Sequence, residues 1–348
     1  MLAMIRKEFR ELRRDRRTMG MLIAFPLLLL VIFGYAANFS VSSVTTVVVG
    51  PSAEPVAEAL PSFFDVTRVD QNGDERSATN DLVDNEANTA VVTSDSAAPV
   101  VLIDGSSLFT AQATVGATKQ AGDDVTTEVL FNPDLKTSWV MVPALIGLIM
   151  TFIGTIVTSL GLVRERQDGT LEQLAVMPLR PSDVILGKVV PYFALAYVDM
   201  IAVTVLGALL FGVPFVGSVI LFGVGAAVFL FVVLGLGVLI STVSQNQGQA
   251  IQTAMFVVMP QILLSGMIFP LSSMPWSVRW IGYVLPLTYF IDIAQGILLR
   301  GAGLSSLWIS YVALAVMAAV VFGGAVLRFR RDLAPKLSGH AAVGSTEA

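Results

Sequence analysis

The 348-residue chain contains no cysteine and only one histidine, His340. Without cysteine it has no disulfide, no thiolate nucleophile and no sulfur ligand for a metal. His340 lies in a polar carboxyl-terminal segment, so we expect no hydrolytic enzyme. The phosphate-binding loop G-x-x-x-x-G-K-[ST] is also missing, because Gly187-Lys188 lacks the earlier glycine and the following hydroxyl residue. The sequence predicts no catalytic, metal or cofactor site, and any ATP would be bound by another chain.

Charged residues are scarce as well. They make up 14% of the chain, whereas 55% is hydrophobic and the mean hydropathy is +0.76. Not one Asp, Glu, Lys or Arg occurs between Met200 and Val278. A soluble globular domain carries about a quarter charged residues. We therefore predict an integral membrane protein.

Several apolar runs are long enough to cross a bilayer, which takes about 20 residues. Three of them are separate, at 18–39, 138–163 and 304–327. The uncharged region is too long for one helix, and turn-forming residues divide 188–271 into spans near 188–211, 217–240 and 249–271. The predicted fold class is a mainly α polytopic membrane protein with six transmembrane helices and an inserted small α+β extracytoplasmic domain.

Basic residues indicate the orientation, because Lys and Arg near span ends stay cytoplasmic. They cluster before the first span, between the second and third, and after the sixth. Both termini, including a tail at 328–348, are therefore predicted to be cytoplasmic. Residues 40–137 then lie outside, and they carry fifteen Asp and Glu against four Lys and Arg. The acidity of the chain belongs to this external region and does not indicate nucleic-acid binding.

Residues 1–17 combine a basic face with apolar residues at helical spacing, Leu2, Ile5, Phe9 and Leu12. This pattern predicts a cytoplasmic amphipathic helix in the membrane interface. The alternatives are a simple topology signal and, less favoured, a secretory signal, whose apolar core is usually shorter.

The external region alternates β-rich and helical stretches. Strands are expected at Val44–Val49, Phe64–Val69, Thr89–Thr93 and Val100–Ile103. Helices are expected at Pro55–Ala59, Ala78–Ala87 and from Ser107 to about Phe131, the last leading back to the membrane. The acidic residues lack the spacing of an EF-hand, so we interpret them as solvated surface rather than a metal site.

The segment 164–187 is charged, although it lies between two apolar runs. Asp168 can cap a short helix at Thr170–Met177, and Pro178 and Pro181 can end it. An ordinary solvated loop is the alternative. A plain connector needs only a few residues, whereas this segment has more than twenty. We therefore interpret it as a docking segment.

The chain resembles the permease subunits of type 2 ABC exporters, in the subgroup with a large external domain between spans one and two. The resemblance covers essentially the whole chain and rests on RERQDGTLEQLAVMPLRP with ILGKVVPY, on ISTVSQNQGQA, on VVVGPSAEPVAEAL with VVLIDGSS, and on SGMIFPLSSMPWSVRWIGYVLPLTYFIDIAQGILLRG. It implies that two permease subunits assemble with two ATPase subunits, which bind ATP and Mg.

The resemblance also implies that the docking segment is a coupling helix in a groove of the ATPase, formed around Arg164, Glu165, Arg166, Gly169, Thr170, Leu171, Glu172 and Leu174. The turn Ser241–Gln249 would form a second cytoplasmic contact through Gln245, Asn246 and Gln247. Residues 272–303, rich in proline, tryptophan and tyrosine, would form re-entrant or interfacial helices that close the outer end of the pathway. An aromatic belt that only anchors the fold explains these residues equally well. Gln295 departs from the family, in which many members have arginine.

Two acidic residues are candidates for the translocation pathway, Asp199 and Asp292. Asp199 lies about 16 Å along a helix from Lys188, near the middle of the bilayer. It would contact a cationic substrate or bind a proton; the alternative is a hydrogen bond to a Tyr, Ser or Thr of a neighbouring span.

The predicted function is export of a hydrophobic or amphipathic drug, lipid or natural product across the plasma membrane of a prokaryote. One alternative is a membrane-anchored receptor for an external ligand. Another is an ion-coupled secondary transporter, for which more intramembrane charges and internal repeats are expected.

Overall fold

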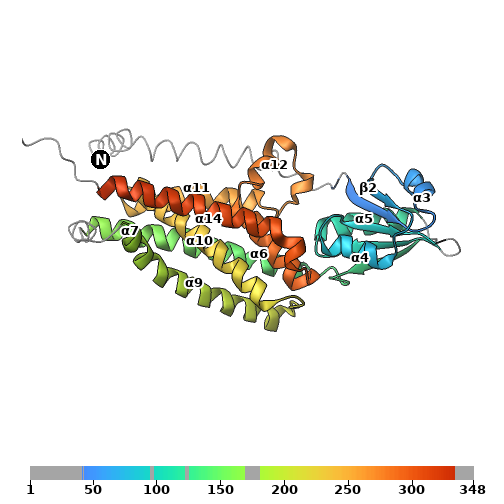
Figure 1. The fold of residues 1–348 in the computed structure, drawn as a ribbon, viewed down its shortest axis with the longest axis horizontal. Coiled ribbons are helices and arrows are strands. Elements are labelled where there is room, and N and C mark those ends of the chain that lie inside the picture. Colours follow the sequence, from blue (N-terminus) through green and yellow to red (C-terminus); the bar gives the residue numbers. More distant parts are fainter. Residues whose placement is uncertain (1–40, 42, 95–97, 122–124, 169–180, 334–348) are drawn as a thin grey trace, which may run out of the picture.

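The computed structural model describes residues 41, 43–94, 98–121, 125–168 and 181–333. Figure 1 shows two parts, a domain built on a β-sheet at one end and a bundle of long helices that extends away from it. The predicted interfacial helix 1–17 and first span 18–39 lie outside the described residues, as does most of the tail.

The sheet domain has five strands in the order β2-β1-β3-β4-β5. Three neighbouring pairs are parallel and one, β3 with β4, is antiparallel. The order along the chain is β1 (Val44–Val49), α3 (Ala53–Ala59), β2 (Phe64–Asp70), α4 (Glu75–Val83), β3 (Thr89–Val92), β4 (Val100–Asp104), α5 (Leu108–Ala121) and β5 (Thr126–Leu130). The helices are the crossovers that parallel strands require.

Side chains on the strands alternate between two apolar cores, because successive residues point to opposite faces of a sheet. Val47 and Val49 of β1 pack on one face with Leu82 of α4. Val48 packs on the other face with residues of α3 and α5, including Ala111. Helices therefore cover both faces, and the domain has a filled interior without a disulfide.

One expectation for this domain was wrong. The helix predicted from Ser107 to about Phe131 ends at Ala121, and Thr126–Leu130 forms β5 beside β4. The segment TTEVL is short and rich in β-branched residues, which favours an edge strand. The chain then enters the bundle at Thr137.

The bundle contains four helices that are long and apolar enough to cross a membrane, among the described residues. The first, Thr137–Gln167, comprises α6 (Thr137–Phe152), the π-helical turn η1 (Ile153–Val157) and α7 (Thr158–Gln167). The others lie within α9 (Pro181–Phe211), α10 (Val219–Val243) and α14 (Leu304–Leu333). They match four of the predicted spans.

The predicted span 249–271 differs in the structure. Its helix is α11 (Gln247–Leu264), and Ser265 and Gly266 then leave the helical path, with Gly266 at a φ of 92°. Glutamine residues lower its hydropathy, and α11 is not among the four. A fifth span is possible if α12 (Trp276–Gly282) and α13 (Pro286–Gln295), with the π-helical turn η3 (Gly296–Arg300), form one, although these helices are bent by 75°.

Helix α10 is the centre of the bundle and packs against α14, η1, α7, α13 and α9. Close approach needs small residues: a Cβ added at Gly237 of α10 would lie 2.6 Å from the carbonyl oxygen of Gly154 in η1. By contrast, α9 and α14 leave most of their apolar side chains exposed, including Leu209 and Val320. Such faces fit contact with lipid or with another membrane protein.

Candidate functional site

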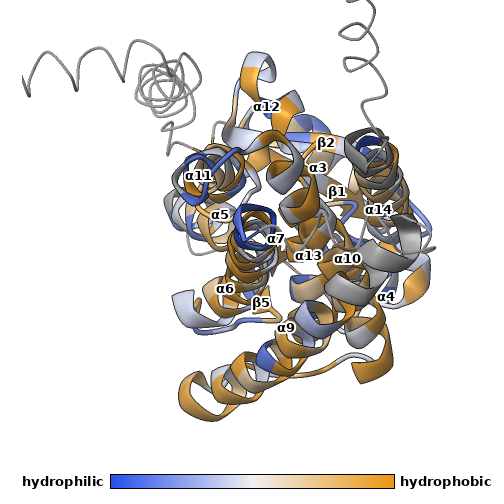
Figure 2. Ribbon diagram, turned by 90° about the vertical axis from the view of Figure 1, so that its left-hand side faces the viewer, coloured by the Kyte–Doolittle hydropathy of each residue, from blue (hydrophilic) through white to orange (hydrophobic). Residues whose placement is uncertain are grey.

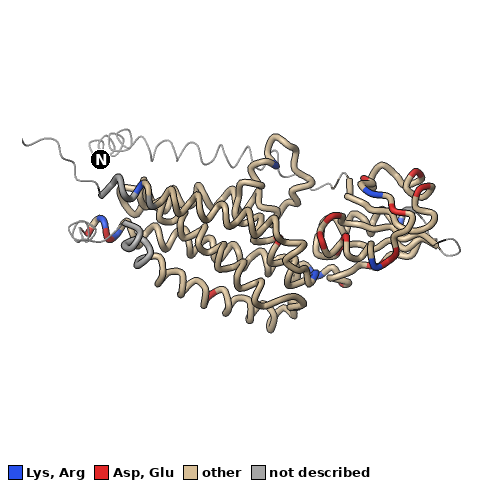
Figure 3. The backbone as a smooth tube through the Cα atoms, viewed as in Figure 1, with Lys and Arg blue, Asp and Glu red and all other residues tan. Residues whose placement is uncertain are grey.

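Charged residues gather at the two ends of the bundle, and few lie between them (Figure 3). The carboxyl end of α7 and the turn between α10 and α11 lie at one end. The other holds α13, η3 and the sheet domain (Figure 1). The residues predicted for docking and Asp292 are therefore at opposite ends.

Arg166 joins the two segments that the sequence predicts to form cytoplasmic contacts. Its Nη1 donates hydrogen bonds to the carbonyl oxygens of Ser241, at 3.0 Å, and Ser244, at 3.3 Å. These carbonyls lie at the carboxyl end of α10, where backbone oxygens lack helical partners and a cation is favoured. The end of α7 is thereby attached to the end of α10.

The turn after α10 is organised by its amide side chains. Asn246 caps α11, because its Oδ1 accepts a hydrogen bond from the Gln249 backbone N–H at 2.9 Å. Gln249 Oε1 in turn accepts from the backbone N–H of Gln245, at 2.9 Å. Gln247 Nε2 donates to Gln167 Oε1 of α7 at 3.3 Å. The ends of α7 and α11 are hydrophilic and lie side by side in the end-on view (Figure 2).

The other residues predicted for docking lie partly in the described chain. Arg164 is exposed on α7, with its Nε 3.9 Å from Asp168 Oδ2, and Glu165 is half-buried. Asp168 follows the last residue of α7, and its backbone N–H donates to the Arg164 carbonyl oxygen. Pro181 begins α9, a position where its fixed φ is favoured. Gly169, Thr170, Leu171, Glu172 and Leu174 lie outside the described residues, as does the helix predicted at 170–177.

Asp199 lies on α9 and is half-buried. Within the described chain the structure shows no hydrogen bond or ion pair that would bind it to a neighbouring span. A carboxylate in this position is costly in a membrane unless water or a ligand solvates it.

Asp292 is part of a charge network between the bundle and the sheet domain. Its Oδ1 accepts from Arg300 Nη2 at 3.1 Å and from Asn85 Nδ2 at 3.4 Å, and its Oδ2 accepts from Ser310 Oγ at 2.6 Å. Arg300 is 7% exposed, and its Nη1 lies 3.9 Å from Oδ2 of Asp104 at the end of β4. Two elements of the bundle and the end of one strand thus share an ion cluster, in which Arg300 and Asp104 are buried and Asp292 is partly exposed.

Sequence reasoning singled out Asp292 but missed Arg300 and Asp104. Asp104 is completely buried, and burial raises the pKa of its carboxyl, with the attraction of Arg300 and the hydrogen bonds from Ser106 acting in the opposite direction. One signal was present in the sequence: Arg300 is an arginine directly after an apolar helix and before Gly301, a position where an unpaired charge is costly.

Comparison with known proteins shows the family to which this chain belongs. The sequence model of the family described as "ABC-2 family transporter protein" matches residues 16–327. The chain belongs to this family. The resemblance to type 2 ABC permeases is thereby confirmed, and this ABC-2 protein is the permease subunit of an ABC exporter.

Individual relatives agree with this assignment. The "Probable multidrug ABC transporter permease YbhS" of Escherichia coli (strain K12) is 31% identical, over 85% of this chain and 87% of that protein. The "Inner membrane transport permease YhhJ" of the same strain is 34% identical over 60% of this chain and 56% of that one. "ABC transporter G family member 20" of Dictyostelium discoideum is 30% identical over 62% of this chain and 30% of that protein.

Family membership has direct consequences. The permease is a multi-pass membrane protein and a transport subunit, and an ABC permease works with an ATPase partner. The predicted role in transport is confirmed.

Proposed function

We propose that this permease exports a hydrophobic or amphipathic molecule, such as a drug, a lipid or a natural product, across the plasma membrane of a prokaryotic cell. YbhS, which the chain matches over most of its length, is named as a probable multidrug ABC transporter permease. ATP and Mg would bind to the separate ATPase subunit, and this chain would bind neither.

The coupling face is the end of α7 together with the turn from Ser241 to Gln249. One observation supports it: Arg166 and Gln247 connect segments that are far apart in sequence into one polar surface, at the end of the bundle opposite the sheet domain. The segment 164–187 would continue this surface. Arg164, Glu165, Arg166, Gly169, Thr170 and Glu172 would orient it on the ATPase, and Leu171 and Leu174 would anchor it.

The same geometry supports an orientation. If the coupling face is cytoplasmic, the end of α14 at Leu333 is cytoplasmic as well, and the sheet domain is extracytoplasmic. Both termini would then be cytoplasmic, as the sequence predicts. The positive residues near the span ends favour this arrangement. Helices α12 and α13, bent against each other, would then lie at the outer end of the pathway.

A second copy of the permease would complete the pathway. The centre of the bundle is filled by apolar side chains, among them Phe229 and Phe290 at 4.6 Å between ring centroids. A pathway for a molecule of any size therefore needs a second bundle beside the first. The exposed apolar faces of α9 and α14 leave surface available for such contact.

Asp199 is the pathway residue that we propose on α9, as a contact for a cationic group of the substrate or as a proton site. The test is Asp199→Asn in the complete transporter. Loss of export with normal yield and normal recovery of the ATPase supports the proposal. A lower yield of folded permease would instead assign Asp199 a structural role.

The coupling face is tested by purifying tagged permease from its native membrane in mild detergent and identifying a co-purifying ATPase with Walker motifs. Wild type is compared with a variant in which Glu165, Leu171 and Glu172 are alanine. The control changes the same residue types on the sheet domain, at Glu54, Glu58 and Leu60. We expect the ATPase with wild type and with the control, and its loss from the coupling variant. Loss from the control as well, or recovery with all three, would contradict the assignment.

A further inference from the structure

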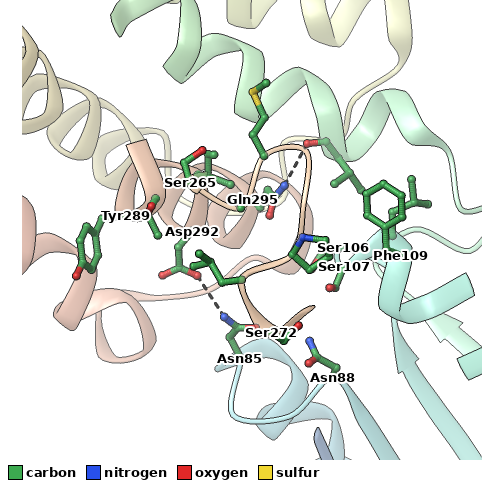
Figure 4. Close-up of a pocket in the computed structure, with 18 of the residues that line it drawn as sticks. Asn85, Asn88, Ser106, Ser107, Phe109, Ser265, Ser272, Tyr289, Asp292 and Gln295 are labelled. Carbon is green, nitrogen blue, oxygen red and sulfur yellow. Dashed lines mark hydrogen bonds between the residues drawn. The ribbon is translucent and has the colours of Figure 1, made fainter. Parts of the chain in front are cut away.

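A pocket of about 480 Å³ lies where the sheet domain meets the bundle. Its walls come from both parts: the loop before β3 and the start of α5 on one side, and α6, the end of α11, α13 and η3 on the other. Figure 4 shows Asn85 and Asn88 of the sheet domain across from Asp292 and Gln295 of α13. Under the proposed orientation, it lies at the outer end of the pathway.

The polar lining of this pocket consists mainly of uncharged groups. Amide side chains come from Asn85, Asn88 and Gln295, and hydroxyl groups come from Ser106, Ser107, Ser265, Ser272, Thr288, Ser310, Tyr283 and Tyr289. The charged residues in the lining are Asp292 and Arg300, which form an ion pair of 3.1 Å with each other. Because Asp292 and Arg300 pair with each other, neither presents an unpaired charge to a ligand.

Two polar side chains of the lining have unused hydrogen-bonding capacity. Ser265 is 2% exposed, and its Oγ has no hydrogen-bond partner among the described residues. The side-chain amide of Asn88 is likewise without a hydrogen bond in the part of the chain that the structure describes, although its backbone bonds to Thr45 and Asp104. Ser265 is buried, and a buried polar group without a partner is costly, so a ligand that reaches its Oγ gains binding energy. The Asn88 amide is partly exposed and can exchange water for a ligand.

Apolar and aromatic residues complete the walls. Phe109 and Val140 lie beside the polar groups on the sheet-domain side and on α6, and Met267 and Ile291 lie towards the bundle. Tyr283 and Tyr289 add amphipathic rings, and the Tyr289 hydroxyl donates to the Tyr283 carbonyl oxygen at 2.7 Å. Such a lining fits a molecule that has both a polar and an apolar part.

We propose that this pocket binds the uncharged, polyhydroxylated head group of an amphipathic molecule, which is the chemistry of a glycosylated amphiphile. The inference rests on the proposed export function and specifies the class of its cargo. A sugar offers many hydroxyl groups to the free amide and hydroxyl groups. A charged head group would lose its hydration beside Asp292 and Arg300, which already pair with each other. The role proposed for Asp199 concerns another part of the cargo, because Asp199 does not line this pocket.

The test uses the full-length permease in phosphatidylcholine nanodiscs and three probes with the same alkyl chain. The probes are hexyl β-maltoside, hexyltrimethylammonium and hexyl sulfate, and saturation-transfer difference NMR measures their binding against empty nanodiscs. We expect the maltoside to bind through its sugar protons and the two charged probes to bind at least tenfold more weakly, a difference of about 1.4 kcal/mol.

Substitutions at Asn88 test whether the maltoside binds in this pocket. Asn88→Ala should weaken maltoside binding about fivefold to tenfold, through one lost hydrogen bond. Asn88→Trp should abolish it by filling the pocket. The matched control is Asn72→Trp, at an exposed asparagine of the same domain outside the pocket lining, which should bind as wild type does.

Each result decides the proposal. Absence of maltoside binding, equal or stronger binding of a charged probe, or maltoside binding that persists in Asn88→Trp would overturn it. Recovery of the ATPase by each variant shows that the permease is folded and separates the two ideas. If wild type recovers the ATPase but fails to bind maltoside, only the pocket assignment is wrong. If the ATPase is never recovered, the export function fails whatever the probes do.

Discussion

Arg166 donates a hydrogen bond of 3.0 Å to the carbonyl oxygen of Ser241, although the two residues are 75 positions apart in the chain. The contact joins the end of α7 to the end of α10 and to the turn that leads into α11. A force applied by an ATPase to the segment after α7 would therefore reach three helices of the bundle. This connection is the basis of the coupling proposed for the permease.

Replacing Arg166 by methionine should destabilise the permease by about 1–3 kcal/mol, since the carbonyls of Ser241 and Ser244 lose a charged donor. The measurement is thermal unfolding of the purified protein in detergent. The control is Arg164→Met, because the Arg164 side chain is 75% exposed and lies 3.9 Å from Asp168. This control should stay within about 0.5 kcal/mol of wild type. Equal stability of the two variants would show that the contact of Arg166 with α10 does not stabilise the permease.

Replacing Arg300 by methionine should cost about 3–5 kcal/mol, because Asp104 and Asp292 would be left without their cation in a buried site. Thermal unfolding and protease digestion of the sheet domain measure the effect. The double variant Arg300→Met with Asp104→Asn should recover part of the loss, since one stranded carboxylate is removed. Arg76→Met, at an exposed position on α4, is the control. A change at Arg300 no larger than that control would contradict the network.

Stability should depend on pH through Asp104. Burial raises the pKa of this carboxyl above its ordinary value of 3.8, so the folded chain keeps a proton at pH values where the unfolded chain has lost it. This contribution to stability is therefore largest at the acidic end of the interval above about pH 4, and it falls as the pH rises to the raised pKa.

The measurement is the unfolding midpoint of wild type and Asp104→Asn at pH values from about 4 to about 8. The decline with rising pH should be shallower in the variant, because the titrating group is gone. Asp81, whose pKa burial also raises, is present in both proteins and cancels in the comparison. Asp65→Asn, at an exposed position on β2, should follow the wild-type profile. A variant profile parallel to wild type would show that Asp104 does not titrate in this way.

The close crossing of α10 and η1 gives a prediction about packing. Gly237→Ala should destabilise the bundle by about 1–3 kcal/mol, because the added Cβ would lie 2.6 Å from the Gly154 carbonyl oxygen. Gly323→Ala on α14 is the control: its Cβ would meet nothing within 4 Å, and alanine favours a helix. The midpoints of thermal unfolding should therefore move in opposite directions, and a neutral Gly237→Ala would contradict the crossing.

Local patterns in the sequence predicted much of this molecule. The motifs indicated the family, and the family comparison confirms it. The strand at Val44–Val49 and the end of the helix at Phe211 lie where the apolar runs and turn residues place them. Such features depend on neighbouring residues, and a single sequence contains that information.

Features that depend on distant residues were not predicted. The pairing of Arg300 with Asp104 joins the bundle to the sheet domain, and no local pattern indicates such a partner. The segment Thr126–Leu130 was predicted to be helical although its β-branched residues favour a strand, and its place beside β4 depends on tertiary pairing. The end of α11 at Leu264 was placed too late, since the apolar sequence continues after the backbone has turned at Gly266.

Photo-crosslinking from Gln247 tests the central claim most directly. The permease is kept in its native membrane, and a photoreactive amino acid replaces one residue in each of three variants. The positions are Gln247 in the turn between α10 and α11, Gln71 in the sheet domain and Ser305 near the start of α14. We predict a crosslink to a Walker-motif ATPase from position 247 alone. Crosslinking of an ATPase from position 71, or its absence at 247 while the permease still co-purifies with an ATPase, would contradict both the coupling face and the orientation.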